Sequence, residues 1–233
     1  MKLEVLRDAL SVARRGAQEI AAQARAAVET RGRFSVALSG GHTPWQMLEA
    51  LAQEQVPWDA VHLFQVDERV APAGDPDRNL THIAQSLLAR VALPTGNLHA
   101  MPVEEKDLNA AAARYARELA RVAGAPPVLD LVHLGLGPDG HTASLVPGDP
   151  VLEADEKEVA LSGPYQGHRR MTLTFPILDR ARSILWLVTG TEKSGMLLRL
   201  QAGDRRIPAG RVRGDRALIL ADVEAAPRTS QRG

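Results

Sequence analysis

The sequence of 233 residues contains no cysteine and no excess of either charge. Without cysteine the chain has no disulfide framework, no thiolate nucleophile and no thiolate metal site. Lysine plus arginine and aspartate plus glutamate each total 28, so no basic excess favours a nucleic acid or an anionic membrane surface. A small anionic ligand is compatible with this balance, because a few cations in one cleft do not change the total.

Long apolar runs and metal-ligand motifs are absent as well. The first twenty residues carry charges every few positions and contain no apolar stretch of signal-peptide or membrane-spanning length. No His-Glu-x-x-His pattern indicates a metal, and no Gly-Lys-Ser/Thr of a P-loop indicates a nucleoside triphosphate. We therefore expect a cytoplasmic protein that uses neither metal nor cofactor and binds a small molecule rather than a nucleic acid or a membrane.

The spacing of the apolar residues predicts alternating helices and strands. It predicts an amphipathic helix over residues 3–30 and a fold of the α/β class, with a mostly parallel, Rossmann-like sheet that has helices on both faces. Further strands are expected near 34–38, 61–66, 129–134, 170–175 and 184–189, and further helices near 45–51, 79–90, 107–123 and 192–200. We expect a single domain over 1–233, with irregular structure or a small extra sheet around 149–170.

Residues 134–148, LGLGPDGHTASLVPG, contain the spacing of a dinucleotide-binding fingerprint, Gly135-x-Gly137-x-x-Gly140. That fingerprint requires a helix at the last glycine, whose N-terminus binds the pyrophosphate. Pro147 and Gly148 would break such a helix after about two turns. We reject a dinucleotide site and predict a tight loop at a strand end that exposes backbone N–H groups and one imidazole.

Ligands of open α/β sheets bind at the carboxyl ends of the strands, and four strand ends are unusual here. They are Ser39-Gly40-Gly41-His42-Thr43-Pro44, Asp67-Glu68-Arg69, Gly137-Pro138-Asp139-Gly140-His141-Thr142 and Thr189-Gly190-Thr191-Glu192-Lys193. In the first, paired glycines, a capping Thr43 and a proline fit either an anion seat or an ordinary turn. In the last, Thr191 as N-cap would place Lys193 in the first helical turn, where it is either solvated or shares an anion with the helix.

The other two strand ends carry an arginine and a histidine, and each of these residues has two alternative roles. Arg69 could serve a ligand or form a surface ion pair with Asp67 or Glu68, and His141 could be catalytic or hydrogen-bonded within its loop. One imidazole, one lysine, one arginine and two backbone anion seats suit a phosphorylated small molecule that undergoes acid–base or hydrolytic chemistry.

These residues resemble the 6-phosphogluconolactonase family over nearly the whole length. The motifs that carry the resemblance are, in order, VALSGGHTP, FQVDERV with the following DPDRN, LDLVHLGLGPDGHTASLVPG, RMTLTFPIL, LVTGTEKSGML and IPAGRV. The resemblance implies a fold related to glucosamine-6-phosphate deaminase and ribose-5-phosphate isomerase. It also implies metal-free hydrolysis of 6-phosphoglucono-1,5-lactone, a phosphorylated sugar lactone, in the oxidative pentose phosphate pathway.

The resemblance also implies roles for individual residues. His141 becomes the general base that activates water against the lactone carbonyl, and Asp139 either orients the imidazole or caps the loop. The implied substrate-binding residues are Gly40, Gly41, His42, Thr43, Asp67, Arg69, Asn79, Arg170 and Lys193. A lactone is an activated ester, so one base, an oriented water and oxyanion donors suffice.

Two positions depart from the family pattern, and two rival functions stay open. His42 stands where serine is usual, and Arg78-Asn79 replaces a Ser-Asn pair. One rival is a glucosamine-6-phosphate deaminase, but in those enzymes an Asn-Glu-Pro segment follows the histidine, whereas Thr-Ala-Ser-Leu-Val-Pro-Gly follows His141 here. The other is a non-catalytic sugar-phosphate sensor, for which we find no basic excess or spare DNA-binding segment.

Overall fold

The computed structural model describes residues 1–226, and the last seven positions of the predicted 1–233 domain lie outside them. Its strands are β1 (Lys2–Leu6), β2 (Phe34–Leu38), β3 (Val61–Gln65), β4 (Asp67–Arg69), β5 (Leu98–His99), β6 (Leu131–Gly135), β7 (Val159–Tyr165), β8 (His168–Leu173), β9 (Ile184–Val188) and β10 (Ala217–Asp222). Its helices are α1 (Ala9–Arg31), α2 (His42–Leu51), α3 (Asn79–Ile83), α4 (Leu108–Ala123), α5 (Phe175–Arg180), α6 (Ser194–Gln201) and α7 (Pro208–Arg211).

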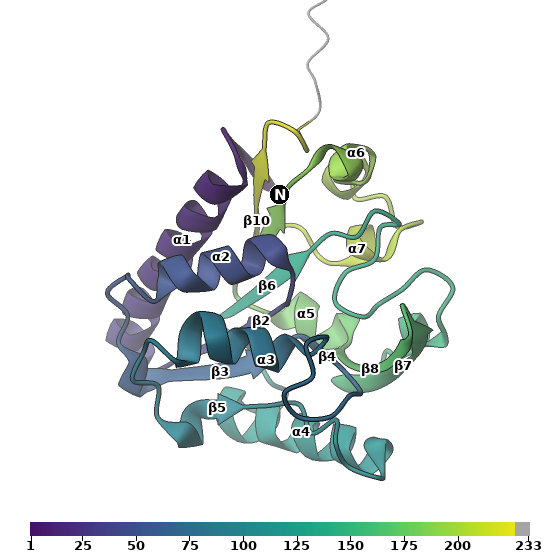
Figure 1. Cartoon of the computed structure of the whole chain (residues 1–233). Coiled ribbons are helices and arrows are strands. Elements are labelled where there is room, and N and C mark those ends of the chain that lie inside the picture. The colour runs from purple at the N-terminus through teal and green to yellow at the C-terminus, as the bar shows by residue number, and fades with distance from the viewer. Residues whose placement is uncertain (227–233) are drawn as a thin grey trace, which may run out of the picture.

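Two sheets organise these elements (Figure 1). Seven strands form a sheet of order β1-β10-β9-β6-β2-β3-β5 in which every pair is parallel. Strands β4, β8 and β7 form a smaller antiparallel sheet. The α/β fold with a mostly parallel sheet is confirmed.

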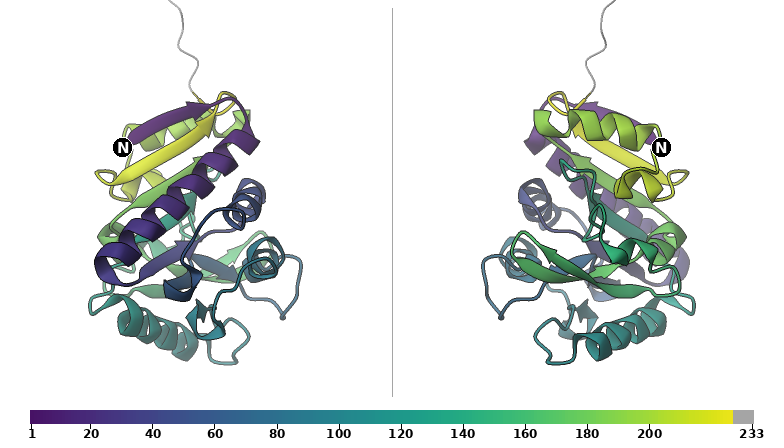
Figure 2. Two further views of the ribbon diagram at one scale, coloured as in Figure 1. Left: turned by 90° about the vertical axis from the view of Figure 1, so that its left-hand side faces the viewer. Right: turned by 90° about the vertical axis from the view of Figure 1, so that its right-hand side faces the viewer.

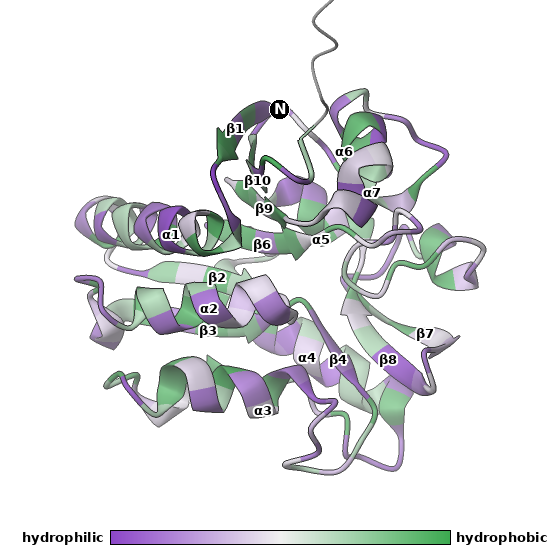
Figure 3. Cartoon of the chain, turned by 45° about the horizontal axis from the view of Figure 1, so that its top comes forward, coloured by the Kyte–Doolittle hydropathy of each residue, from purple (hydrophilic) through white to green (hydrophobic). Residues whose placement is uncertain are grey.

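Helices cover both faces of the large sheet, as its apolar strands require. Helices α1, α2 and α3 pack with Phe34, Val36 and Leu38 in one apolar cluster. Helices α4 to α7 and the small sheet contribute to the cluster on the other face, which includes Ala37 and Phe64. Figure 2 shows α1 lying across one face, and Figure 3 shows the strands of the large sheet mostly in green, between helices that alternate green and purple. Because the small sheet shares this core, we propose that residues 1–226 form one domain.

The first helix begins later than predicted. Asp8 caps α1 by accepting a hydrogen bond from the backbone N–H of Ser11 at 2.7 Å, so the helix starts at Ala9. Residues 2–6 instead form β1, which pairs in parallel with β10. The helix prediction for residues 3–6 is therefore wrong. Leu3, Leu6 and Leu10 have the spacing of a helix, but residues 2–6 pair with β10, a strand that lies more than 200 positions later and that the local apolar pattern cannot reveal.

The chain passes from the large sheet to the small one at Val66. Its N–H donates to the carbonyl of Leu38 in β2, and its carbonyl accepts from Leu173 in β8. The strand predicted near 170–175 therefore forms as β8, but it belongs to the antiparallel sheet, and α5 begins at Phe175. Within residues 1–226 we find no helix that is both long and apolar enough to cross a membrane.

Candidate active site

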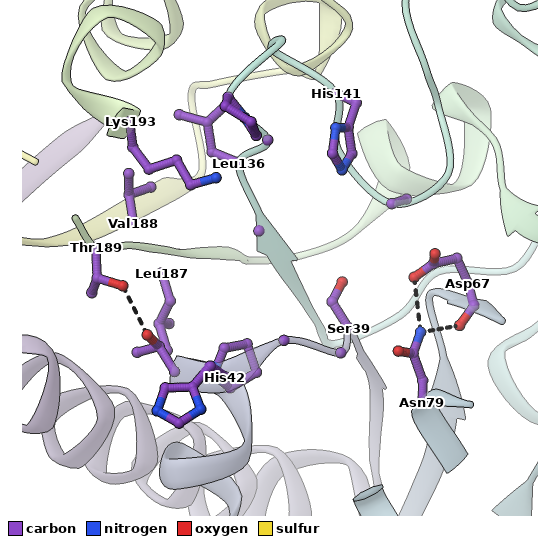
Figure 4. Close-up of a pocket in the computed structure, with 18 of the residues that line it drawn as sticks. Ser39, His42, Asp67, Asn79, Leu136, His141, Leu187, Val188, Thr189 and Lys193 are labelled. Atoms are coloured by element: carbon purple, nitrogen blue, oxygen red, sulfur yellow. Dashed lines mark hydrogen bonds between the residues drawn. The ribbon is translucent and has the colours of Figure 1, made fainter. Parts of the chain in front are cut away.

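A cavity of about 410 Å³ opens where the carboxyl ends of β2, β6 and β9 meet the small sheet (Figure 4). Every site residue predicted from the sequence lines it, apart from Asp139. Those that line it are Gly40, Gly41, His42, Thr43, Asp67, Arg69, Asn79, His141, Arg170 and Lys193. The structure therefore brings together side chains from six separate stretches of the sequence.

The loop after β6 turns tightly and holds the imidazole of His141 toward the cavity (Figure 4). The N–H of Gly137 donates to the carbonyl of His141 at 2.8 Å, and the N–H of Gly140 donates to that of Gly137 at 3.0 Å. A Cβ on Gly137 would collide with the His141 ring, so the glycine lets the backbone pass directly beneath the imidazole. The fingerprint-like glycines thus serve this turn, and residues 141–149, which follow Gly140, form no helix.

Asp139 lies behind His141 rather than in the cavity wall. Its Oδ1 is 2.5 Å from the Nδ1 of His141 and accepts the backbone N–H of the same residue at 3.1 Å. Burial acts to raise the pKa of Asp139, but the hydrogen bonds from His141 outweigh it and hold that pKa below its ordinary value. The carboxylate therefore stays ionised, and the imidazole that it holds by Nδ1 keeps Nε2 for a ligand.

The loop between β2 and α2 comes very close to α3. A Cβ on Gly40 would collide with the amide of Asn79, whose Nδ2 donates to the carbonyl of Asp67 at 2.9 Å. The N-cap of α2 is Gly41, and no side chain caps this end of the helix. The predicted cap, Thr43, lies inside the first turn instead, 2.8 Å from the Thr189 hydroxyl. That prediction is wrong because Gly41, with φ of 127°, starts the helix two residues earlier.

Lys193 lies on the neighbouring loop after β9. Asp222 at the end of β10 accepts the N–H of Gly190 at 3.1 Å, and a short 3₁₀ turn over Thr191–Lys193 leads into α6. The predicted N-cap role of Thr191 is wrong, because its hydroxyl donates to Glu224 and Gly190 precedes the turn. The Lys193 ammonium extends toward the cavity (Figure 4), with Glu192 at 4.0 Å as a weak partner.

Glu68 organises the segment around β4. It is fully buried, and its carboxylate accepts the backbone N–H groups of Arg69, Asn79 and Leu80, each at 2.8 Å. The surface ion pair considered for Arg69 is therefore wrong: Glu68 faces inward, and the Arg69 guanidinium donates to the carbonyl of Asp77. These contacts fix the start of α3 against β4 and hold Arg69 at the cavity wall.

Asp67 is buried and connects the two sides of the cavity. Its Oδ2 accepts the Ser144 hydroxyl at 2.6 Å, and its Oδ1 lies 3.4 Å from the amide nitrogen of Asn79 (Figure 4). Because Ser144 follows the His141 loop, this carboxylate ties the small sheet to the loop that carries the imidazole. The serine gave no signal in the sequence, since its partner lies 77 positions away.

Two arginines face each other across the small sheet. Arg69 of β4 pairs in register with Arg170 of β8, an arrangement that like charges disfavour. Arg170 is only 4% exposed, and this burial lowers the pKa of its guanidinium. The Nε atoms of both arginines are buried without a hydrogen-bond partner among residues 1–226. Unpaired buried donors on two cations beside a cavity provide a site for an anion.

The two departures from the family pattern have different structural outcomes. Arg78 is buried and faces away from the cavity, where its guanidinium pairs with Glu104 and lies 3.6 Å from Glu68. It therefore supports the loop and is absent from the cavity lining. His42 does line the cavity, exposed at its rim, with Trp45 edge-on at 6.4 Å between ring centroids.

Tyr165 is a site residue that the sequence analysis missed. Its hydroxyl lies 3.2 Å from Oδ2 of Asp139 and 3.4 Å from Nδ1 of His141. The tyrosine ends β7 and is followed by a two-residue turn, Gln166-Gly167, in which both residues have positive φ. A Tyr-Gln-Gly tripeptide indicates a turn, but nothing in the sequence reveals that this turn reaches a loop 24 positions away.

Within residues 1–226, the histidines outside the cavity lining form no metal cluster. His133 is fully buried in β6, and its Nδ1 is 3.3 Å from the N–H of Ser39. His99 lies between His62 and Glu118, at 3.1 and 2.9 Å. In the part of the chain described, no group of three or more His, Asp or Glu side chains could hold a metal ion.

Comparison with known proteins shows the family of the chain. The model of the family described as glucosamine-6-phosphate isomerases/6-phosphogluconolactonase matches residues 7–220. The chain belongs to this family. It is 38% identical to a 6-phosphogluconolactonase of Synechocystis over 207 residues, which is 85% of this chain and 86% of the relative.

Solved structures of the family share the fold. A 6-phosphogluconolactonase of Thermotoga maritima superposes with a TM-score of 0.84 at 30% identity, covering 95% of this chain and 98% of that one. A monomeric glucosamine-6-phosphate deaminase superposes with a TM-score of 0.83 at 16% identity, covering 97% and 98%. The predicted relation of the fold to this deaminase is confirmed, and at that identity the likeness concerns the fold alone.

Proposed function

We propose that this protein hydrolyses 6-phosphoglucono-1,5-lactone to 6-phosphogluconate, with His141 as general base. The observation that carries the proposal is the His141 imidazole, bonded to a carboxylate through Nδ1 and directed into a cavity that three cationic side chains line. The similarity to 6-phosphogluconolactonases over most of both chains supports the same reaction. The predicted cytoplasmic location stays a prediction.

The arrangement provides both proton transfers of the hydrolysis. In the neutral imidazole that donates its Nδ1–H to Asp139, the Nε2 lone pair can accept a proton from water. The water oxygen then bonds to the lactone carbonyl carbon, and the carbonyl oxygen takes the negative charge. When the ring C–O bond breaks, the imidazolium returns the proton to the leaving ring oxygen, and the base is regenerated. Asp139 stabilises the transient imidazolium without taking the proton itself.

Hydrogen-bond donors for the substrate phosphate lie on both sides of the cavity. The uncapped N-terminus of α2 at Gly41 and the Lys193 ammonium lie on adjoining loops joined by the Thr43–Thr189 contact. Backbone N–H groups at a helix start and a lysine together suit a phosphate dianion. Arg69 and Arg170, with unpaired Nε atoms, supply further donors from the small sheet. We propose that Gly40, His42, Asp67 and Asn79 shape the cavity around the sugar.

The deaminase alternative lacks a required acid. Residues 142–148, which follow the histidine, contain no aspartate or glutamate. The carboxylate that contacts His141 is Asp139, from the preceding turn, and it binds Nδ1 rather than reaching into the cavity. Hydrolysis of a lactone needs only the base and water, so the chain has the groups for the lactonase reaction and lacks the acid expected for the deaminase.

The direct test follows acid release from freshly prepared 6-phosphogluconolactone against its spontaneous hydrolysis. We expect strong acceleration by the protein and no ammonia release from glucosamine-6-phosphate. Ammonia release at enzyme-like rates, with no effect on the lactone, would show that the function is deamination. Tight binding of 6-phosphogluconate without turnover of either compound would point to the sensor alternative.

A further inference from the structure

Tyr165 reaches the base from the small sheet, and the predicted site residues that it contacts are His141, Asp139 and Arg170. Its ring packs edge-on against His141, with centroids 5.1 Å apart and an interplanar angle of 64°. Its hydroxyl lies 3.2 Å from Asp139 Oδ2. Since Asp139 Oδ1 already accepts both N–H groups of His141, the tyrosine occupies the one carboxylate oxygen that the histidine leaves unused.

The Tyr165 hydroxyl has one hydrogen and two possible acceptors, Asp139 Oδ2 and His141 Nδ1. Which of them accepts the hydrogen depends on the tautomer of His141. If His141 carries its proton on Nδ1 and donates to Asp139, the tyrosine can donate only to Asp139 Oδ2. If His141 carries the proton on Nε2, Nδ1 becomes an acceptor that competes for the tyrosine hydrogen. The 3.2 Å distance to Oδ2 is shorter than the 3.4 Å distance to Nδ1. Only the first arrangement leaves the Nε2 lone pair free for water.

The tyrosine is itself held firmly. The turn at Gln166-Gly167 pairs Tyr165 with His168 across the hairpin, and positive φ at both turn residues matches the twist of the strands. Arg170 donates to the Tyr165 carbonyl at 3.2 Å, and its Cζ lies 5.1 Å from the ring centroid. Burial, followed by the Asp139 charge, raises the pKa of the Tyr165 hydroxyl, so it stays a donor at neutral pH.

We propose that Tyr165 is a positioning residue: it donates to Asp139 Oδ2, prevents that carboxylate from rotating, and thereby keeps the His141 proton on Nδ1. The inference rests on the proposed role of His141 as general base. It assigns to the small sheet a part in the chemistry, besides its part in phosphate binding, because the hairpin holds the carboxylate oxygen that does not bind the imidazole.

The test compares Tyr165→Phe with Tyr115→Phe, since these are the only two tyrosines of the chain. Tyr115 also has a bonded hydroxyl, but it lies in α4 against Gln65 and His99, outside the cavity lining. A net hydrogen bond is worth about 0.5–1.5 kcal/mol, so Tyr165→Phe should lower kcat by roughly twofold to twelvefold. KM should stay within about twofold. Tyr115→Phe should reduce thermal stability and leave kcat unchanged.

A second measurement determines the tautomer of His141 directly and does not depend on catalytic turnover. In ¹⁵N spectra of labelled protein, His141 should show a protonated Nδ1 in the natural chain and a growing Nε2–H population in Tyr165→Phe. Unchanged kcat and an unchanged tautomer in that variant would overturn the inference, and so would a raised KM at constant kcat, which would mark Tyr165 as a substrate contact. If the natural chain does not hydrolyse the lactone, the proposed function fails, and the spectra still decide whether Tyr165 sets the tautomer.

Discussion

The two sheets contribute to the same cavity in different ways. The seven-stranded sheet presents loops at the ends of apolar strands. Hydrogen bonds among its own residues close the His141 loop, whereas Gly40 packs against Asn79 and the N–H of Gly190 donates to Asp222. The three-stranded sheet presents side chains from the strands themselves, and these depend on pairing between segments about 100 positions apart, as for Arg69 and Arg170. The large sheet therefore contributes loop residues to the site, and the small sheet contributes residues of paired strands.

The two sheets also differ in the proposed roles of their residues, which are catalytic or ligand-binding in one and mainly supporting in the other. The loops of the large sheet carry the proposed base and the lysine, whereas the small sheet supports the His141 loop through Tyr165 and Asp67. Glu68 of the small sheet fixes the start of α3. Substitution in the loops should therefore reduce catalysis at constant stability, and substitution in the small sheet should affect catalysis and stability together.

The largest effect is expected for His141→Asn on the large-sheet side. Loss of general-base catalysis typically costs about 10²- to 10⁴-fold, so kcat should fall by that order while the phosphorylated product still binds. Steady-state rates on 6-phosphogluconolactone and calorimetric binding of 6-phosphogluconate measure the two quantities. A variant with nearly natural kcat would contradict the role of His141.

The matched control makes the same His→Asn substitution at His62, outside the cavity. His62 lies at the start of β3, at the end of the sheet opposite to the cavity, and bonds to His99 rather than to a site residue. His62→Asn should leave kcat unchanged. Equal losses in the two variants would mean that replacement of any histidine disturbs the fold, and the contrast between the two regions would then have no support.

The next effect compares one cation from each region. Loss of a charge-assisted contact costs about 1.5–3 kcal/mol, so Lys193→Met and Arg69→Met should each lower kcat/KM for the phosphorylated lactone roughly tenfold to hundredfold. Hydrolysis of unphosphorylated gluconolactone should barely change. Lys193→Met should leave the thermal midpoint unchanged or slightly higher, because a cation near a helix start is unfavourable, whereas Arg69→Met should lower it through the lost bond to Asp77.

The ratio of rates on the two lactones decides the outcome. Equal reduction on both substrates, or unfolding of the Lys193→Met protein, would show that Lys193 does not serve the phosphate. Equal changes in thermal midpoint for the two variants would instead remove the proposed difference between the loop and the small sheet.

The sequence predicted the large-sheet half of the site better than the other half. Strand ends such as Gly137–Thr142 can be recognised locally, because glycine, proline and an Asp-x-His spacing define a turn. Thr43 and Thr191 were assigned caps they do not form, because Gly41 and Gly190 begin these turns earlier. On the other side, a surface ion pair with Glu68 was one of two alternatives for Arg69, but Glu68 is buried because its backbone donors come partly from α3, eleven and twelve positions later.

The smallest effect concerns stability against pH and arises from the interior of the large sheet. His133 is fully buried beside β2 and β9, and burial lowers its pKa to about 3 from an ordinary value near 6.5. Burial also lowers the pKa of His99 and His62. The unfolded chain therefore binds protons below about pH 6.5 that the folded chain does not bind. Stability from this source is complete above that pH and falls as the pH decreases toward about 3.

Urea unfolding at several pH values measures this slope, which is at most about 1.4 kcal/mol per pH unit for each histidine. His133→Gln keeps an acceptor for the Ser39 N–H and removes the titrating ring, so the slope between about pH 6 and 5 should become shallower. His62→Gln should change it less, because the half-buried His62 is partly solvated. Since neither residue lies in the cavity lining, kcat at neutral pH should be unchanged. An unaltered slope between about pH 6 and 5 in His133→Gln would show that His133 does not cause the acid sensitivity there, because carboxylates such as Asp139, whose pKa is lowered, take up protons only at lower pH.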